Sequence, residues 1–162
     1  MFSDDLRHRA ETLLALYRER ELTLVTAESC TGGLVAGLIT EIPGSSNVFE
    51  RGYVTYSNRA KAENLGVPAD LLERFGAVSA EVAAAMAEGA LRHSAASVAL
   101  SVTGIAGPDG GTAAKPVGLV YFGCGRIGQI TTLEKRFGNI GRSEVRLASV
   151  ETALELLVSA AD

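Results

Sequence analysis

The alternation of helical and strand-like segments constrains this chain more than any other feature of its sequence. Short runs rich in β-branched and aromatic residues indicate strands at 22–27, 49–56, 97–103, 117–124 and 130–137. Capping residues and apolar residues at helical spacing indicate helices at 3–20, 34–40, 57–66, 68–76, 79–93 and 143–160. Helices interleaved with strands, with one hairpin near the end, predict an α/β fold: a three-layer α/β/α sandwich with a mixed, mostly parallel sheet.

The composition favours a single folded domain over residues 1–162. Hydrophobic residues make up 47% of the chain and charged residues 21%, a balance typical of a globular protein. The longest apolar stretches are far shorter than the roughly 20 residues that span a bilayer, and no charged-then-apolar leader precedes Ser3. We therefore expect no membrane partner and no secretion. Cys30 and Cys124 are too few for a disulfide framework and lack metal-ligand spacing, which favours the cytoplasm.

The charge balance and the histidine count limit the chemistry further. A formal net charge of -4 argues against a nucleic-acid partner, because phosphate backbones require a concentrated basic face. Any phosphate-bearing partner is therefore expected to be a small molecule. The chain has two histidines, His8 and His93, both in predicted helical segments. A histidine base or a histidine-bound metal thus has almost no candidates, and we expect no metal and no cofactor.

A polar turn, 28–33, joins the first predicted strand to the helix that follows it. Ser29 and Thr31 lie at the start of this helix, where free N–H groups can bind an anion or stabilise a developing oxyanion. The simpler interpretation is that Ser29 or Thr31 caps the helix. The turn is not a Gly-x-Ser-x-Gly elbow, and the scarcity of histidine argues against a Ser-His-Asp triad. Cys30 is a second candidate nucleophile, but we expect this small apolar residue to pack into the core.

A serine nucleophile without histidine needs another base, and a desolvated lysine can serve as one. Lys61 lies in a short predicted helix just after the second strand, whereas Lys115 and Lys135 lie in a loop and in the hairpin. The alternative for Lys61 is a solvated surface position, which is usual for helical lysines. Tyr56, at the end of the second strand, either presents its hydroxyl to the same region or simply buries its ring.

The segment 104–116 is rich in glycine and proline and predicts a loop with special backbone angles. It follows the end of a strand, which is where α/β proteins place ligands, and its glycines let a phosphate or sugar approach the backbone. It is neither a Walker loop nor a Gly-x-Gly-x-x-Gly fingerprint, so a plain surface loop is the alternative. Arg142 and Arg146, four residues apart at the start of the last helix, either hold a phosphate or face solvent.

Four segments, in this order, resemble the CinA C-terminal-domain family. They are Thr26-Ala-Glu-Ser-Cys-Thr-Gly-Gly33, Phe49-Glu-Arg-Gly-Tyr-Val-Thr-Tyr-Ser-Asn58 with Lys61, Gly76-Ala-Val-Ser79, and Gly104-Ile-Ala-Gly-Pro-Asp-Gly-Gly111 with Lys115-Pro-Val-Gly118. The resemblance runs from about Leu6 to Leu157. The catalytic members of this family are nicotinamide-nucleotide amidohydrolases.

The resemblance implies hydrolysis of the carboxamide of nicotinamide mononucleotide, giving nicotinate mononucleotide and ammonia, without a metal. Ser29 matches the nucleophile of the family, Lys61 its base, and Tyr56 a neighbouring hydroxyl that helps to move the proton. A homo-oligomer is also implied. The residues expected to bind the substrate are Thr31, Gly32, Gly33, Ser46, Asn58, Thr103, Gly104, Gly107 and Arg142.

The chain departs from the family pattern just before the last helix. Family members commonly carry Gly-Asp-Arg there, whereas this chain has Asn139-Ile-Gly-Arg142, which keeps the arginine and lacks its acidic neighbour. Two alternatives to the deamidase stay open. One is a non-catalytic domain that senses a pyridine nucleotide, and the other is a Ser/Lys amidase that acts on another small amide. With no second domain like that of longer CinA proteins, we expect no fused nucleotide-pyrophosphatase activity.

Overall fold

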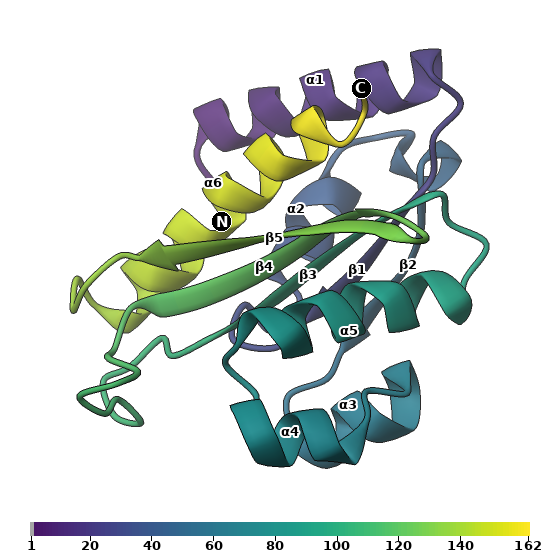
Figure 1. Ribbon diagram of the computed structural model, residues 1–162. Helices are drawn as coiled ribbons and strands as arrows, with labels where there is room; N and C mark the ends of the chain where they lie inside the picture. Colours follow the sequence, from purple (N-terminus) through teal and green to yellow (C-terminus); the bar gives the residue numbers. More distant parts are fainter. Residues whose placement is uncertain (1) are drawn as a thin grey trace.

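A five-stranded sheet runs through the middle of the molecule and separates two layers of helices (Figure 1). The computed structural model describes residues 2–162. The strand order is β2-β1-β3-β4-β5. The strands are β1 (Leu24–Glu28), β2 (Phe49–Val54), β3 (Val98–Gly104), β4 (Leu119–Arg126) and β5 (Gln129–Arg136). The three-layer α/β/α sandwich expected from the sequence is confirmed.

The helices divide between the two faces of the sheet. One layer contains α2 (Leu34–Glu41) and α6 (Arg142–Ser159), with α1 (Asp4–Glu19) packed on both of them. The other layer contains α5 (Ala80–Arg92), which covers β3, β4 and β5 and carries α3 (Asn58–Leu65) and α4 (Ala69–Phe75) on its outer side. Within residues 2–162, no helix combines the length and the apolar character needed to cross a membrane.

The strand directions bring three chain segments to the same edge of the sheet. β1 pairs parallel with both β2 and β3, whereas β4 pairs antiparallel with both β3 and β5. β4 therefore runs against the other strands, and the sheet is mixed, as predicted. The carboxyl ends of β1, β2 and β3 lie together, and this edge is where open α/β sheets bind ligands.

Serine caps set where three of the helices begin. The side chains of Ser3, Ser57 and Ser79 accept hydrogen bonds from the backbone N–H groups of Leu6, Ala60 and Val82, at 3.2, 3.0 and 3.2 Å. These contacts satisfy N–H groups that a helix leaves without an internal partner. They fix the starts of α1, α3 and α5 at the residues that the sequence indicated.

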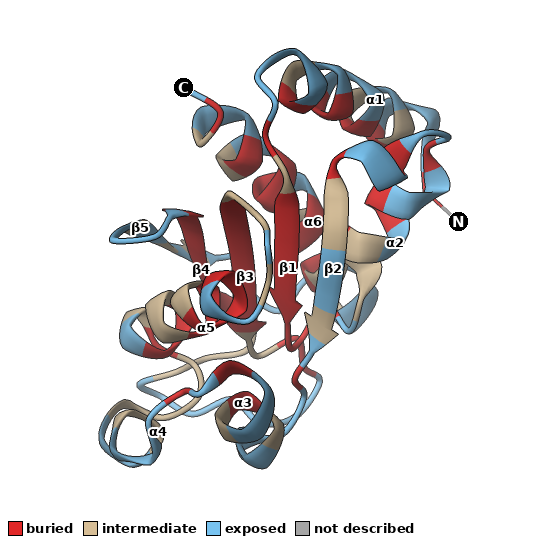
Figure 2. Cartoon of the chain, turned by 90° about the vertical axis from the view of Figure 1, so that its right-hand side faces the viewer, coloured by how far each residue is buried: buried red, intermediate tan, exposed pale blue. Residues whose placement is uncertain are grey.

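Two hydrophobic clusters fill the spaces on the two faces of the sheet, and both draw on the buried strands β1 and β3 (Figure 2). Helix α3 approaches α5 very closely at Gly89. A Cβ atom on Gly89 would lie 1.9 Å from the carbonyl oxygen of Leu65 at the end of α3. Only glycine therefore fits at this position without a shift of one helix, and this contact seats α3 against α5.

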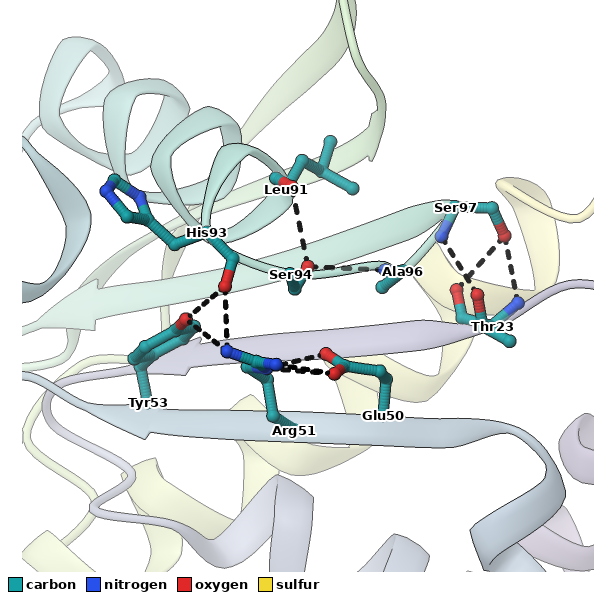
Figure 3. A network of polar contacts seen from close by, with 9 residues as sticks. All are labelled: Thr23, Glu50, Arg51, Tyr53, Leu91, His93, Ser94, Ala96 and Ser97. Atoms are coloured by element: carbon teal, nitrogen blue, oxygen red, sulfur yellow. Dashed lines mark hydrogen bonds and ion pairs between the residues drawn. The ribbon is translucent and has the colours of Figure 1, made fainter.

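Polar contacts connect the edge strand β2 to the end of α5 (Figure 3). The Tyr53 hydroxyl and the Arg51 guanidinium both donate to the carbonyl oxygen of His93, at 2.7 and 2.9 Å. Thr23 and Ser97, just before β1 and β3, exchange hydrogen bonds between side chain and backbone in both directions. These contacts hold the starts of β1 and β3 together and attach β2 to the C-terminal end of α5.

Candidate active site

A cavity of about 270 Å³ opens at the carboxyl edge of the sheet. It lies between the turn after β1, the segment from β2 into α3, the loop after β3 and the start of α6. Of the residues expected from the sequence, it is lined by Ser29, Tyr56, Lys61, Thr103, Gly104, Gly107 and Arg142. A larger cavity, of about 410 Å³, lies between the β4–β5 turn and the end of α6 and contains none of the expected site residues.

Ser29 and Lys61 meet inside this cavity, although 32 residues separate them in sequence. The Lys61 Nζ atom lies 2.9 Å from Ser29 Oγ and 2.8 Å from the carbonyl oxygen of Thr55. Ser29 follows the last residue of β1, and Lys61 lies in the first turn of α3. The parallel pairing of β1 with β2 places the turn after β1 next to the segment that leads from β2 into α3. The nucleophile and the base expected from the sequence are therefore in hydrogen-bond contact.

Lys61 is one of the most buried side chains of the protein, with a relative exposure of 1%. Burial lowers the pKa of its ammonium group, because the charged form loses its hydration. A neutral amine has two hydrogen atoms and one lone pair. It can donate to Thr55 and accept the hydroxyl proton of Ser29 at the same time, which is the geometry of a general base.

The Tyr56 hydroxyl is held by Arg142 at the rim of the cavity. Arg142, the first residue of α6, donates to Tyr56 Oη at 2.9 Å and to the carbonyl oxygen of Gly107 at 2.8 Å. These two contacts join the β2–α3 segment to the glycine loop across the mouth of the cavity. The guanidinium of Arg142 is bonded to neutral oxygens on both sides, so an anionic group can compete for it with a stronger, charge-assisted interaction.

The turn after β1 is capped by Glu28, which the sequence did not indicate. The completely buried Glu28 carboxylate accepts hydrogen bonds from the N–H groups of Gly33, Val35 and Ala36, at 3.0, 3.1 and 2.9 Å. Neither Ser29 nor Thr31 caps α2. The helix N–H groups that were expected to meet an anion are occupied by this carboxylate, because Glu28 ends β1 with its side chain directed at the helix start.

Arg146 holds the same turn from its other side. Its Nε donates to the carbonyl oxygen of Cys30 at 3.1 Å, and its Nη2 donates to the carbonyl oxygen of Thr31 at 3.0 Å. The sequence suggested a phosphate or solvent as the partner of this arginine. Both donors instead bind the backbone beside Ser29, because α6 packs against α2 in the same layer.

Cys30 lies in the hydrophobic core and also contributes to the cavity wall. Burial raises the pKa of the Cys30 thiol to about 12. A thiol with this pKa stays protonated at neutral pH and is a poor nucleophile. Of the two adjacent residues, Ser29 is the one whose side chain contacts Lys61.

The loop after β3 forms part of the cavity wall. The Thr103 hydroxyl donates to the carbonyl oxygen of Ala77 at 2.8 Å, and the Lys115 ammonium donates to the carbonyl oxygen of Phe75 at the end of α4. These two contacts attach the loop to the segment between α4 and α5. Ala77 and Val78 of that segment also line the cavity, and their small apolar side chains carried no signal in the sequence.

The remaining expected residues lie outside the cavity lining. Thr31 is completely buried, and Gly32 and Gly33 complete the turn beneath Ser29. Asn58 is exposed at the start of α3. Ser46 is exposed in a short 3-10 helix, η1 (Ser45–Asn47), which precedes β2 and so lies at the opposite edge of the sheet from Ser29. No group of three or more His, Cys, Asp or Glu side chains suited to a metal occurs in residues 2–162.

The sequence and fold of this chain resemble those of known proteins. A CinA-like protein of Geotalea uraniireducens is 51% identical over 158 residues, which is 97% of this chain and 37% of that relative. The crystal structure of competence/damage inducible protein CihA from Agrobacterium tumefaciens is 49% identical and matches with a TM-score of 0.97, covering 100% of this chain and 99% of that one. A CinA superfamily protein from Klebsiella pneumoniae matches with a TM-score of 0.92 at 31% identity, covering 96% of this chain and 97% of that one.

The curated relatives are longer than this chain, which spans a little over a third of their length. The family model for the CinA C-terminal domain matches residues 6–161. That match includes the turn with Ser29, the helix with Lys61 and the loop that faces them. Sequence and structure thus agree that the chain belongs to the CinA C-terminal domain family.

Proposed function

We propose that the protein is an amidohydrolase that converts nicotinamide mononucleotide to nicotinate mononucleotide and ammonia. The observation that carries the proposal is the buried Lys61 amine, 2.9 Å from Ser29 Oγ in a cavity at the carboxyl edge of the sheet. A perturbed lysine next to a serine hydroxyl is typical of a nucleophile activated by its base. The family resemblance supplies the substrate class.

The reaction divides into two acyl transfers at Ser29. Neutral Lys61 takes the Ser29 proton while Oγ forms a bond to the carboxamide carbon and the carbonyl π electrons move to oxygen. The C–N bond then breaks, the amide nitrogen takes the proton from Lys61, and ammonia leaves behind an ester on Ser29. A water molecule next gives a proton to Lys61 and attacks the ester, which releases the carboxylate and restores the Ser29 hydroxyl.

Arg142 is the residue best placed to recognise the nucleotide end. Its guanidinium lines the cavity and, among residues 2–162, binds two neutral oxygens, those of Tyr56 and Gly107. A substrate phosphate would replace these contacts with charge-assisted hydrogen bonds. Tyr56 keeps its hydroxyl at the mouth of the cavity through the same arginine, which supports a role for Tyr56 in the site.

Ammonia release from purified protein and nicotinamide mononucleotide tests the proposal. The wild type should release ammonia and nicotinate mononucleotide in equal amounts, whereas Ser29→Ala and Lys61→Met should release neither above background. Full activity in either variant contradicts the mechanism. If the wild type binds the mononucleotide without turnover, the chain is a pyridine-nucleotide sensor. If it cleaves only other amides, it is a Ser/Lys amidase of different specificity.

Two properties of the whole protein are also proposed. The family resemblance favours a homo-oligomer, which light scattering on the purified chain tests. The buried free cysteines, Cys30 and Cys124, fit a reducing compartment such as the cytoplasm.

A further inference from the structure

The loop after β3 presents one carboxylate to the cavity, that of Asp109, which lines the same cavity as Ser29 and Lys61. Asp109 is exposed, whereas Ser29 and Lys61 are buried. The carbonyl oxygen of Gly107, two residues before Asp109, accepts from Arg142 Nη1 at 2.8 Å. Asp109 therefore lies at the mouth of the cavity, at the end where Arg142 is found.

Close packing on both sides of Asp109 fixes the path of this loop. A Cβ atom on Gly107 would lie 2.6 Å from Cγ1 of Val117, and one on Gly111 would lie 2.8 Å from the backbone nitrogen of Val117. The backbone of the loop thus contacts the start of the next segment both before and after Asp109. This arrangement keeps Asp109 at the cavity without any contact made by its own side chain.

The side chain of Asp109 has no structural partner. An aspartate in a Pro-Asp-Gly sequence commonly accepts a hydrogen bond from the backbone of its own turn. In this loop, hydrogen bonds between side chain and backbone are made by Thr103 and Thr112 instead. Within residues 2–162, the Asp109 carboxylate takes part in no hydrogen bond and no ion pair, although Arg142 lines the same cavity. Both of its oxygens are therefore available to a ligand.

We propose that Asp109 recognises the ribose of the substrate by accepting hydrogen bonds from its 2′- and 3′-hydroxyl groups. The inference rests on the proposed function, because a ribose reaches Asp109 when a nucleotide occupies the cavity. An ionised carboxylate accepts hydrogen bonds and donates none, and its two oxygens can accept from two neighbouring hydroxyls. Acidic side chains bind ribose hydroxyls in the same way in dinucleotide-binding folds.

The position of Asp109 selects the ribose from the groups of the mononucleotide. The carboxamide has to reach Ser29 at the buried end of the cavity, and the phosphate is assigned to Arg142 at the mouth. A phosphate monoester is largely ionised at neutral pH and has few protons to donate. The ribose connects the ring to the phosphate, so its hydroxyls are the donors that pass closest to an acceptor at the mouth.

A binding cycle between protein and ligand variants tests this contact. Calorimetry in a Ser29→Ala background keeps the substrate intact, and the ligands are nicotinamide mononucleotide, its 2′-fluoro analogue and its 3′-deoxy analogue, the fluoro analogue carrying fluorine in place of the hydroxyl. With Asp109 present, loss of either hydroxyl should weaken binding by about tenfold. With Asp109→Ala added, the mononucleotide should bind about tenfold or more weakly, and the two analogues should bind nearly as well as the mononucleotide.

Two further variants separate hydrogen bonding from charge. Asp109→Asn removes the charge and keeps one acceptor oxygen, so it should retain part of the preference for the unmodified ribose. Asp70→Asn is the matched control, because Asp70 is exposed in the first turn of α4 and lies outside the cavity lining. It removes the same charge and should leave the affinities for all three ligands unchanged.

Equal weakening of all three ligands by Asp109→Ala would show that Asp109 acts through charge or loop shape, and it would overturn the proposal, as would unchanged affinities. The two proposals fail in different ways. If the wild type releases no ammonia from the mononucleotide, the proposed function fails, and the binding cycle in the Ser29→Ala background still decides the role of Asp109. If the wild type is active and the cycle shows no coupling, the role of Asp109 alone is wrong.

Discussion

Lys61 Nζ lies 2.8 Å from the carbonyl oxygen of Thr55, the residue that follows β2. This contact holds one N–H of the amine, so the lone pair of its neutral form is free to accept the proton of the serine hydroxyl. A guanidinium can make the same contact but stays charged, because its pKa lies far above neutral pH. Lys61→Arg should therefore introduce a permanent positive charge and remove the base. We expect kcat to fall by about 10³-fold or more in ammonia-release assays, and substantial activity in Lys61→Arg would exclude Lys61 as the base.

The lowered pKa of Lys61 also links its charge to stability. Burial lowers the pKa in the folded protein, whereas the unfolded chain keeps the ordinary value of 10.5. Between these two values the unfolded state binds one proton more, so the free energy of unfolding rises with pH. The wild type should gain stability relative to Lys61→Met as pH rises from the folded pKa toward 10.5. Urea unfolding of both proteins across this range measures the difference, which would stay constant if Lys61 titrated normally.

Replacing one carboxylate oxygen of Glu28 should lower the stability of the protein considerably. Glu28→Gln places an amide nitrogen where a carboxylate oxygen accepts from the start of α2, so buried N–H groups lose their acceptor. We expect a loss of about 2 kcal/mol or more in the free energy of unfolding. Glu41→Gln, at the exposed end of the same helix, should change stability by less than about 0.5 kcal/mol. Equal urea midpoints for the two variants would show that Glu28 is not the cap.

Two glycines in helices predict opposite effects of the same substitution. In Gly89→Ala the new methyl group meets the carbonyl oxygen of Leu65, so α3 must move and carry Lys61 with it. We expect a loss of about 1 to 3 kcal/mol in stability together with a loss of activity. In Gly37→Ala on α2 the nearest atom lies 4.0 Å away, and alanine favours the helix by about 0.5 to 1 kcal/mol. Thermal unfolding and ammonia release, measured on both variants, test this contrast.

Arg142 predicts a dependence on the phosphate of the substrate. Arg142→Gln removes a charge-assisted donor and should raise KM for nicotinamide mononucleotide by about tenfold or more. KM for nicotinamide riboside, which lacks the phosphate, should change much less. An equal rise for both substrates would assign Arg142 to the walls of the cavity instead of the phosphate.

The local features of this molecule could be predicted from its sequence, because the contacts that produce them span only a few residues. Ser57 bonds to the N–H three positions on, and Gly66 adopts a left-handed conformation that ends α3. The α/β sandwich follows from the order of such elements. The scarcity of histidine suggests a lysine base for Ser29, and the family resemblance assigns that role to Lys61, since spacing alone cannot show which strands are neighbours.

The rest of the site depends on packing between distant segments. Arg146 reaches Cys30 across 116 residues of sequence, and no local pattern indicates that contact. Glu28 was hidden for a different reason: Ser29 and Thr31 are the commoner capping residues and stand next to it. The cavity wall at Ala77 consists of small apolar side chains and backbone, whose role depends on shape alone.

Because Lys61 lies on α3, the protonation state of its amine depends on how this short helix packs against α5. Helix α3 packs against α5, and Gly89 sets how closely it docks. If α3 detaches locally, water returns to Nζ and the amine regains its proton, although Ser29 and the sheet stay in place. The protein would then lose its base well before it loses its fold, so the onset of inactivation on warming would mark the local detachment of α3.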